Sequence, residues 1–393
     1  VWGNGATANR TIRADRIAIA DNLILSGAAG YMFTLDDGTN NAAIPDVLVS
    51  GTVTGSFDLT IDGAGDKQFA GAIGTTGVGN GLGDGTGASL VLSGVGTVSF
   101  DSTIDLDQGI SQSGTAGTVT FRDNVTVAGN TTGTTFDANV VLDGMTFSSA
   151  GAAQIGTTPM DGDTLTLSTG TATLTGDGAW TVYSAVDSSG AQQILALAGA
   201  GTKTFEDTIG GTLAVLRLTQ ADGSGALTLR ANTTVGASGV DLQGNVVLDG
   251  LTLTSAGTVA IGTAAGADTL AVTDTTLTNT DSSITTAAAN QTITLNAVTT
   301  LTRNLTMSSG TAALTVNNTV DGSGPDVGQF VLNNSGADVN GTHINADIGS
   351  TNRLAQFATN DGAGSDETVW GNGATANRTI RADRIAIADN LIL

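Results

Sequence analysis

Short runs in which apolar and polar residues alternate recur along the whole chain, and this pattern constrains the fold more than any other feature. Examples are SFDLTID (56–62), GTVSFDSTIDL (96–106), GTVTFRDNVTV (117–127) and QTITLNAVTTLTRNLTM (291–307). Alternation at period two is typical of β-strands with one buried face, and Gly, Asn and Asp punctuate the runs. No segment combines a helical period with capping residues. The sequence therefore predicts an all-β fold.

A second feature is an identical recurrence. Residues 369–393, VWGNGATANRTIRADRIAIADNLIL, are the same as residues 1–25, and we call these the two copies of the recurring segment. Packed cores tolerate substitution at many positions, so packing alone does not keep two segments identical. The recurrence predicts a window on a tandem array, with one complete unit at 1–368 and the start of the next unit at 369–393. The expected partners are identical neighbouring units of the same chain.

A weaker repeat lies inside the unit. The run GNVVLDGLTLTSAGTVAIGT (244–263) echoes ANVVLDGMTFSSAGAAQIGT (138–157), and GAGTKTFEDTI (199–209) echoes GVGTVSFDSTI (94–104). These matches place internal sub-repeats at about 94–170 and 199–275.

Two architectures fit this organisation: a right-handed parallel β-solenoid of short stacked coils, and a string of immunoglobulin-like β-sandwiches of about 100 residues each. Sandwiches use aromatic core anchors, whereas aromatic residues make up only 4% of this chain. A solenoid core is a narrow stack of Val, Ile, Leu and Ala. Phe69, Phe100 and Phe121 also recur at about one coil length. The sequence favours a continuous solenoid over residues 1–368, with the sandwiches as the alternative.

The charge balance excludes some functions. Thirteen Lys and Arg residues face 36 Asp and Glu, which gives a net charge of −23. Such a surface repels phosphates, so nucleic acid is not an expected partner. No apolar run is long enough to span a membrane as a helix. The chain has no Cys, and together with abundant Thr, Gly and Asp this favours an extracellular, bacterial cell-surface location.

The strand runs resemble a known group of proteins. GAGTKTFEDTIGGTLAVLRLTQADGSGALTLRANTTV (199–235) and GVGTVSFDSTIDLDQGISQSGTAGTVTFRDNVTV (94–127) are similar to the β-strand repeats of giant bacterial surface proteins. These include filamentous-haemagglutinin-like adhesins and autotransporter passengers. The resemblance implies a right-handed β-solenoid with an adhesive or filament-building role. It carries no catalytic residues over to this chain.

Several acidic turns could bind calcium, because Asp oxygens suit hard cations. GNGLGDGTG (79–87), which contains Asp84, partly resembles the calcium-binding nonapeptide of β-helices, but that motif works in consecutive copies and occurs here once. The other candidate ligands are Asp36, Asp37, Asp105, Asp107, Asp161 and Asp163. The ordinary interpretation of each is a solvated turn with Asx hydrogen bonds. No other cofactor is expected.

Catalysis finds little support in the sequence. The single His, His343, lies in an Asn-rich stretch and is expected to face solvent. The pairs Asp105/Asp107 and Asp161/Asp163 could serve a carbohydrate-active enzyme. Alternate residues of a strand share a face whatever the function, however, and the chain has few basic or aromatic residues. We expect no enzyme activity, and a solenoid carbohydrate enzyme is the least favoured alternative.

The recurring segment is unusually basic for this chain, with Arg10, Arg13 and Arg16 close together. Arg13 and Asp15 would share one strand face, which would allow an ion pair. The three arginines could instead meet acidic surface on a neighbouring filament, where repetition gives avidity. The sequence thus predicts a structural segment of a surface fibre, filament or sheath with lateral self-association. The alternative is an adhesin that binds glycan or protein on another surface.

Overall fold

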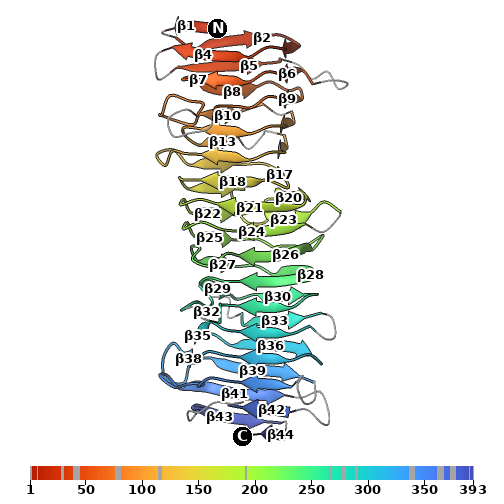
Figure 1. Ribbon diagram of the computed structural model, residues 1–393, viewed down its shortest axis with the longest axis vertical. Helices are drawn as coiled ribbons and strands as arrows, with labels where there is room; N and C mark the ends of the chain where they lie inside the picture. The colour runs from red at the N-terminus through yellow and green to blue at the C-terminus, as the bar shows by residue number, and fades with distance from the viewer. Residues whose placement is uncertain are drawn as a thin grey trace. The chain divides into compact units, whose positions relative to one another are not determined.

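The structure is a computed structural model (Figure 1). It describes residues 2–6, 8–27, 31–38, 45–75, 81–94, 96–113, 117–190, 193–264, 267–275, 280–287, 291–335, 341–360, 367–371, 378–388 and 390–392. The chain divides into two compact units, Val1–Thr202 and Lys203–Leu393. The described residues contain no helix, and so no helix among them could cross a membrane.

In the first unit, successive coils contribute strands to three sheets. The first sheet contains β2 (Arg10–Arg13), β5 (Met32–Asp36), β8 (Asp58–Asp62), β10 (Leu90–Leu92), β13 (Ile110–Gln112), β16 (Thr134–Phe136), β19 (Ala153–Ile155) and β22 (Trp180–Val182). The second sheet contains β3 (Ile17–Ile19), β6 (Val47–Val49), β9 (Lys67–Phe69), β11 (Val98–Phe100), β14 (Val119–Phe121), β17 (Val140–Asp143), β20 (Thr164–Thr169) and β23 (Ala185–Ser188). The third contains β1 (Trp2–Ala6), β4 (Leu23–Gly27) and β7 (Val53–Gly55) and then, beyond bridges at Ile73, β12 (Ile104–Leu106), β15 (Val125–Val127), β18 (Thr146–Ser149), β21 (Thr171–Thr175) and β24 (Ile194–Leu197).

The second unit is built in the same way. Its first sheet contains β25 (Lys203–Phe205), β27 (Leu227–Leu229), β29 (Val246–Asp249), β32 (Thr269–Thr273), β35 (Val298–Leu301) and β38 (Val320–Gly322), followed by bridges at Ile348 and Ile380. A second row of strands contains the first part of β28 (Thr233–Leu242), β30 (Thr252–Ser255), β33 (Ser282–Thr286), β36 (Leu305–Gly310), β39 (Gln329–Asn334), β41 (Leu354–Asn360) and β43 (Ala382–Ile387). A third row contains β26 (Val215–Gln220), the last part of β28, β31 (Val259–Ile261), β34 (Ile293–Leu295), β37 (Leu314–Val316), β40 (Thr342–Ile344), β42 (Glu367–Trp370) and β44 (Asn390–Ile392).

The pairings between described strands are parallel, and each strand pairs with its counterpart in the next coil. Figure 1 shows this as strands stacked rung upon rung within each unit. For example, β11 lies between β9 and β14 and is parallel to both. The predicted parallel β-solenoid is therefore confirmed. The alternative of immunoglobulin-like sandwiches is excluded, because their sheets are antiparallel.

The core consists of the inward-facing residues of each strand. In β11 and β14 the two end residues are buried and the middle residue is partly exposed, as period-two alternation requires. Phe69, Phe100 and Phe121 occupy the same position in three successive coils. Their rings stack with centroids 5.3 and 5.4 Å apart. The expected spacing of one coil between these phenylalanines is confirmed.

Asparagine side chains in the turns between sheets accept hydrogen bonds from the backbone of the next coil. In the first unit the Thr164 N–H donates to Asn139 Oδ1 of the preceding coil at 2.8 Å. In the second unit the Thr269 N–H donates to Asn245 Oδ1 at 3.0 Å. A short side chain reaches the next coil's backbone without leaving the turn, which explains why the turns are rich in Asn and Asp.

Candidate functional site

The first copy of the recurring segment forms a coil that is covered by the coil after it. Its strands β2, β3 and β4 pair with β5, β6 and β7. Ile17 lies opposite Val47 and Leu23 lies opposite Val53, and all four side chains are buried. The segment thus begins the core of the first unit.

The second copy pairs with the coil before it, through the bridge at Ile380 and through β43 and β44. Ile385, the counterpart of Ile17, lies opposite the buried Phe357. Leu391, the counterpart of Leu23, lies opposite the buried Thr368. The same positions of the segment therefore stack on core residues in both copies. Because side chains alternate along a strand, this agreement means that the same residues of the segment lie on the core face of the strands in both copies.

The arginines of the first copy differ in their surroundings. Arg13 donates from Nε and Nη2 to Asp36 Oδ2, at 2.6 and 2.5 Å. The chain bends at Asp15, so Asp15 does not extend the strand of Arg13, and the expected ion pair with Asp15 is replaced by the pair with Asp36. Arg10 and Arg16 are exposed, and no ion pair joins them to another described residue. These two side chains remain available for the predicted contact with a neighbouring filament.

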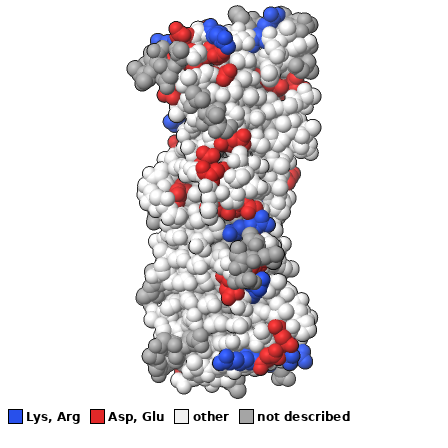
Figure 2. Space-filling model, turned by 180° about the vertical axis from the view of Figure 1, so that it is seen from behind, with Lys and Arg blue, Asp and Glu red and all other residues white. Residues whose placement is uncertain are grey.

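Arginines that bridge acids of neighbouring coils recur along the solenoid surface. In each case the acids belong to the coils before and after the arginine. The groups are Asp101–Arg122–Asp143, Glu206–Arg230–Asp249 and Asp326–Arg353–Asp383. Figure 2 shows charged side chains in separate patches on the face drawn, some of both signs and some acidic only, with uncharged surface between them. The third group includes Asp383, which belongs to the second copy of the recurring segment.

Asp37, a candidate calcium ligand, is instead half of a buried ion pair. Its Oδ2 lies 3.2 Å from Lys67 Nζ, and both side chains are fully buried. The Gly65 N–H donates to both carboxylate oxygens, at 3.1 and 3.2 Å. Lys67 also donates to the carbonyl oxygens of Gly63 (2.9 Å) and Gly65. The charge of Asp37 is thus compensated within the protein.

Asp84, in the Gly-rich loop, lies beside a second acid that the sequence did not single out. Burial and the neighbouring Asp84 carboxylate raise the pKa of Asp58 to about 7. Asp58 Oδ1 is buried and has no hydrogen-bond partner. Asp84 itself accepts hydrogen bonds from the Thr86 N–H and hydroxyl, both at 2.8 Å. The first two residues of this loop, 79 and 80, lie outside the described residues.

The other candidate ligands form two pairs, one at the end of β12 and one in a turn. Asp105 and Asp107 flank the buried Leu106, and burial raises the pKa of both carboxyls. Asp107 accepts a hydrogen bond from the Gly81 N–H at 3.1 Å. The alternation along this strand explains why the two acids share a side.

Asp161 closes the turn that holds the second pair. Its carboxylate accepts from the N–H groups of Thr157 (3.2 Å), Thr158 (3.3 Å) and Asp163 (3.0 Å). Burial raises the pKa of Asp161, but these hydrogen bonds together leave it lowered. Burial, Asp161 and Asp137 raise the pKa of Asp163.

Within the described ranges, no three His, Asp or Glu side chains converge in a way that could hold a metal ion. His343 lies in β40, between the buried Thr342 and Ile344, and is itself partly exposed. Its outward position agrees with the sequence-based expectation. The candidate acidic residues and His343 thus lie in turns and on the outer faces of strands, apart from the buried Asp36 and Asp37.

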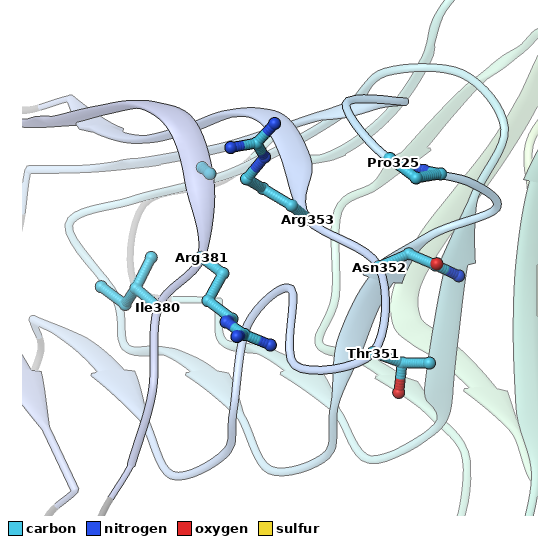
Figure 3. A pocket seen from close by; sticks show the side chains of 7 residues that line it. Pro325, Thr351, Asn352, Arg353, Ile380 and Arg381 are labelled. Carbon is cyan, nitrogen blue, oxygen red and sulfur yellow. The ribbon is translucent and has the colours of Figure 1, made fainter.

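A polar groove of about 500 Å³ opens beside the second copy of the recurring segment. Figure 3 shows Thr351, Asn352 and Arg353 on one side and Ile380 and Arg381 on the other. The Arg381 Nη1 donates to the Ser350 carbonyl oxygen at 3.1 Å. The groove therefore lies between the coil that contains Thr351, Asn352 and Arg353 and the coil of the second copy of the recurring segment.

The burial of Lys67 and Lys203 was not predicted from the sequence, although the residues around each lysine indicate it. Lys67 stands two residues before Phe69, and Lys203 stands two residues before Phe205. Alternate residues share a face, so each lysine must point inward with the phenylalanine. Both lysines of the chain are indeed buried.

Comparisons with known proteins leave the family open. No family model matches the sequence, no curated protein is significantly similar to it, and no solved structure matches the fold at a significant level.

Proposed function

We propose that this chain is a structural, non-catalytic segment of a giant extracellular repeat protein that forms a cell-surface fibre. The observation that carries the proposal is that both copies of the recurring segment place the same residues opposite core residues of a neighbouring coil. Ile17 and Ile385 both stack on core residues of a neighbouring coil. Each coil of a solenoid packs mainly against its neighbouring coils. A segment that uses the same residues for this packing in both copies therefore fits an array of stacked units.

The bridging arginines support a structural role. Arg122 and Arg230 each join acids of the coils before and after their own. A single exposed ion pair contributes little to the stability of a protein. A network of such pairs along a fibre would contribute more and would help to hold neighbouring coils in place. The acidic surface would keep such a fibre soluble.

Immunogold labelling of the source cells tests this function. Antibodies raised against the folded chain are applied to intact and to permeabilised cells. The proposal predicts label on intact cells, arranged along extended surface structures. Label that appears only after permeabilisation would overturn it.

A further inference from the structure

We propose that Asp58 and Asp84 bind a calcium ion between β8 and residues 83–87 of the Gly-rich loop. Asp58 is the first residue of β8, and Asp84 lies in the loop that leads into β10, which pairs with β8 in the same sheet. The two acids therefore come from successive coils. This inference goes beyond the proposed function, and neither depends on the other.

The Asp58 side chain provides the observation that points to a ligand. The residue is 7% exposed, and its Oδ1 is buried without a hydrogen-bond partner among the described residues. Buried polar atoms are normally paired, because an unpaired one has lost its contact with water and gained nothing in exchange. A cation beside Oδ1 would supply the missing interaction.

The Asp58 carboxylate lies against the backbone of the loop. A Cβ added to Gly83 would lie 3.3 Å from Asp58 Oδ1, and a Cβ added to Gly87 would lie 3.8 Å from Asp58 Oδ2. Both glycines have a positive φ, +121° at Gly83 and +73° at Gly87, which other residues rarely adopt. The two glycines thus let the loop pass close to the carboxylate, and Oδ1 points at the loop.

Asp84 brings a second carboxylate to the same place. Its N–H hydrogen-bonds to the Asp58 carboxyl, and the N–H and hydroxyl of Thr86 donate to its Oδ1 at 2.8 Å. Burial, and then the charge of Asp84, raise the pKa of Asp58 to about 7. Above this pH both acids are ionised, and a cation between them would relieve their repulsion.

The contrast with Asp37 shows what is missing at Asp58. Asp37 is a fully buried acid whose charge is compensated by Lys67, 3.2 Å away. No Lys or Arg of the described residues forms an ion pair with Asp58. The positive charge that balances Asp58 and Asp84 is therefore expected to come from a bound ion.

Calcium fits this set of donors. It binds carboxylate oxygens, backbone carbonyl oxygens and water, and it accepts irregular arrangements of about six to eight of them. Among the described residues no third His, Asp or Glu joins the pair, so loop carbonyl oxygens and water would complete the site. With two charged ligands, we expect a dissociation constant of about 10⁻⁴–10⁻³ M, as in extracellular calcium modules.

Isothermal titration calorimetry with CaCl₂ tests the site on the whole chain. The protein is first freed of divalent cations with EDTA and is titrated at a pH above 7, where Asp58 is ionised. About 0.15 M NaCl screens the diffuse attraction of cations to the acidic surface. The test variants are Asp84→Asn and Asp58→Asn, and circular dichroism checks that each keeps its strands. Asp161→Asn is the matched control, because backbone N–H groups already occupy that carboxylate.

The unsubstituted chain and Asp161→Asn should bind calcium with the same affinity. Each test variant should bind at the site at least about tenfold more weakly, since the charge of the ligands sets calcium affinity. Asp58→Asn removes a buried charge and is expected to fold at this pH, so a loss of binding in that variant reports the site itself. Absence of calcium binding by the unsubstituted chain, or unchanged affinity in either test variant, would overturn the proposal.

Discussion

Lys67 and Asp37 form an ion pair inside the solenoid, with 3.2 Å between Nζ and Oδ2 and with both side chains fully buried. Moving two charges out of water is unfavourable, and their attraction offsets this only when hydrogen bonds satisfy the remaining groups. The Gly65 N–H and the carbonyl oxygens of Gly63 and Gly65 supply those hydrogen bonds. The pair is therefore stable as a unit and sensitive to the loss of either member.

Lys67→Met should lower the free energy of unfolding by about 3–5 kcal/mol, because Asp37 is left as a buried charge without its partner. Arg353→Met is the matched control, since its pair with Asp326 is exposed to solvent and should contribute little to stability. Urea unfolding of both variants measures the difference. Equal small losses would contradict the buried-pair account.

The contrast between Phe121 and Asp37 shows what could be predicted from sequence. Period-two alternation and coil spacing are local patterns, and they were enough to predict the solenoid and the spacing of one coil between Phe69, Phe100 and Phe121. Partners between coils depend on the lengths of the turns, which vary along the chain. Asp37 was therefore interpreted as a candidate calcium ligand, although Lys67 lies beside it.

Arg13 illustrates the same limit. Its partner Asp36 is 23 residues away, whereas Arg353 and Asp326 are 27 residues apart. A fixed coil length would not have found both pairs. The sequence placed Asp15 on the strand of Arg13, but the bend at Asp15 ends that strand. The side-chain contacts between coils could therefore be identified only from the structure. Which residues face inward and which face outward could be predicted from the sequence.

Gly55→Ala should destabilise the first unit by clearly more than Gly162→Ala does. Gly55 has φ +132°, and an added Cβ would lie 1.7 Å from the Leu25 carbonyl oxygen in the recurring segment. Gly162→Ala is the control, because Gly162 has φ +94° but open space around it. The control should lose only the backbone strain, about 1–2 kcal/mol. Thermal unfolding of both variants checks this, and a smaller loss for Gly55→Ala would be evidence against the close stacking.

Asp58 should make stability depend on pH. Its pKa is raised from 3.8 to about 7 by burial and by Asp84. Between these values the folded chain holds a proton that the unfolded chain has released, so stability should fall as pH rises from about 4 to about 7. Asp58→Asn stays neutral and should flatten this part of the profile and be more stable than the parent at pH above about 7. Urea unfolding across this range measures it, and identical slopes in both proteins would refute the assignment.

Arg10→Ser with Arg16→Ser, made together with the same changes at Arg378 and Arg384, should reduce side-by-side association of fibres, because these arginines are exposed and form no ion pair with another described residue. Arg13 is left in place, since it is paired with Asp36. Bundle width in electron micrographs at low salt measures the effect, and the unmodified fibres should also separate as salt is added. Arg217→Ser, which removes an arginine elsewhere, is the control. Bundles of unchanged width would argue against this contact.

The contour length of arrays of known size shows whether identical units stack into one structural fibre. Chains of one, two and three units, each ending with residues 369–393, are imaged by electron microscopy. We expect uninterrupted rods that lengthen by the same increment with every unit, at about 4.8 Å for each coil. Compact beads joined by flexible gaps, with distances that vary from particle to particle, would contradict it.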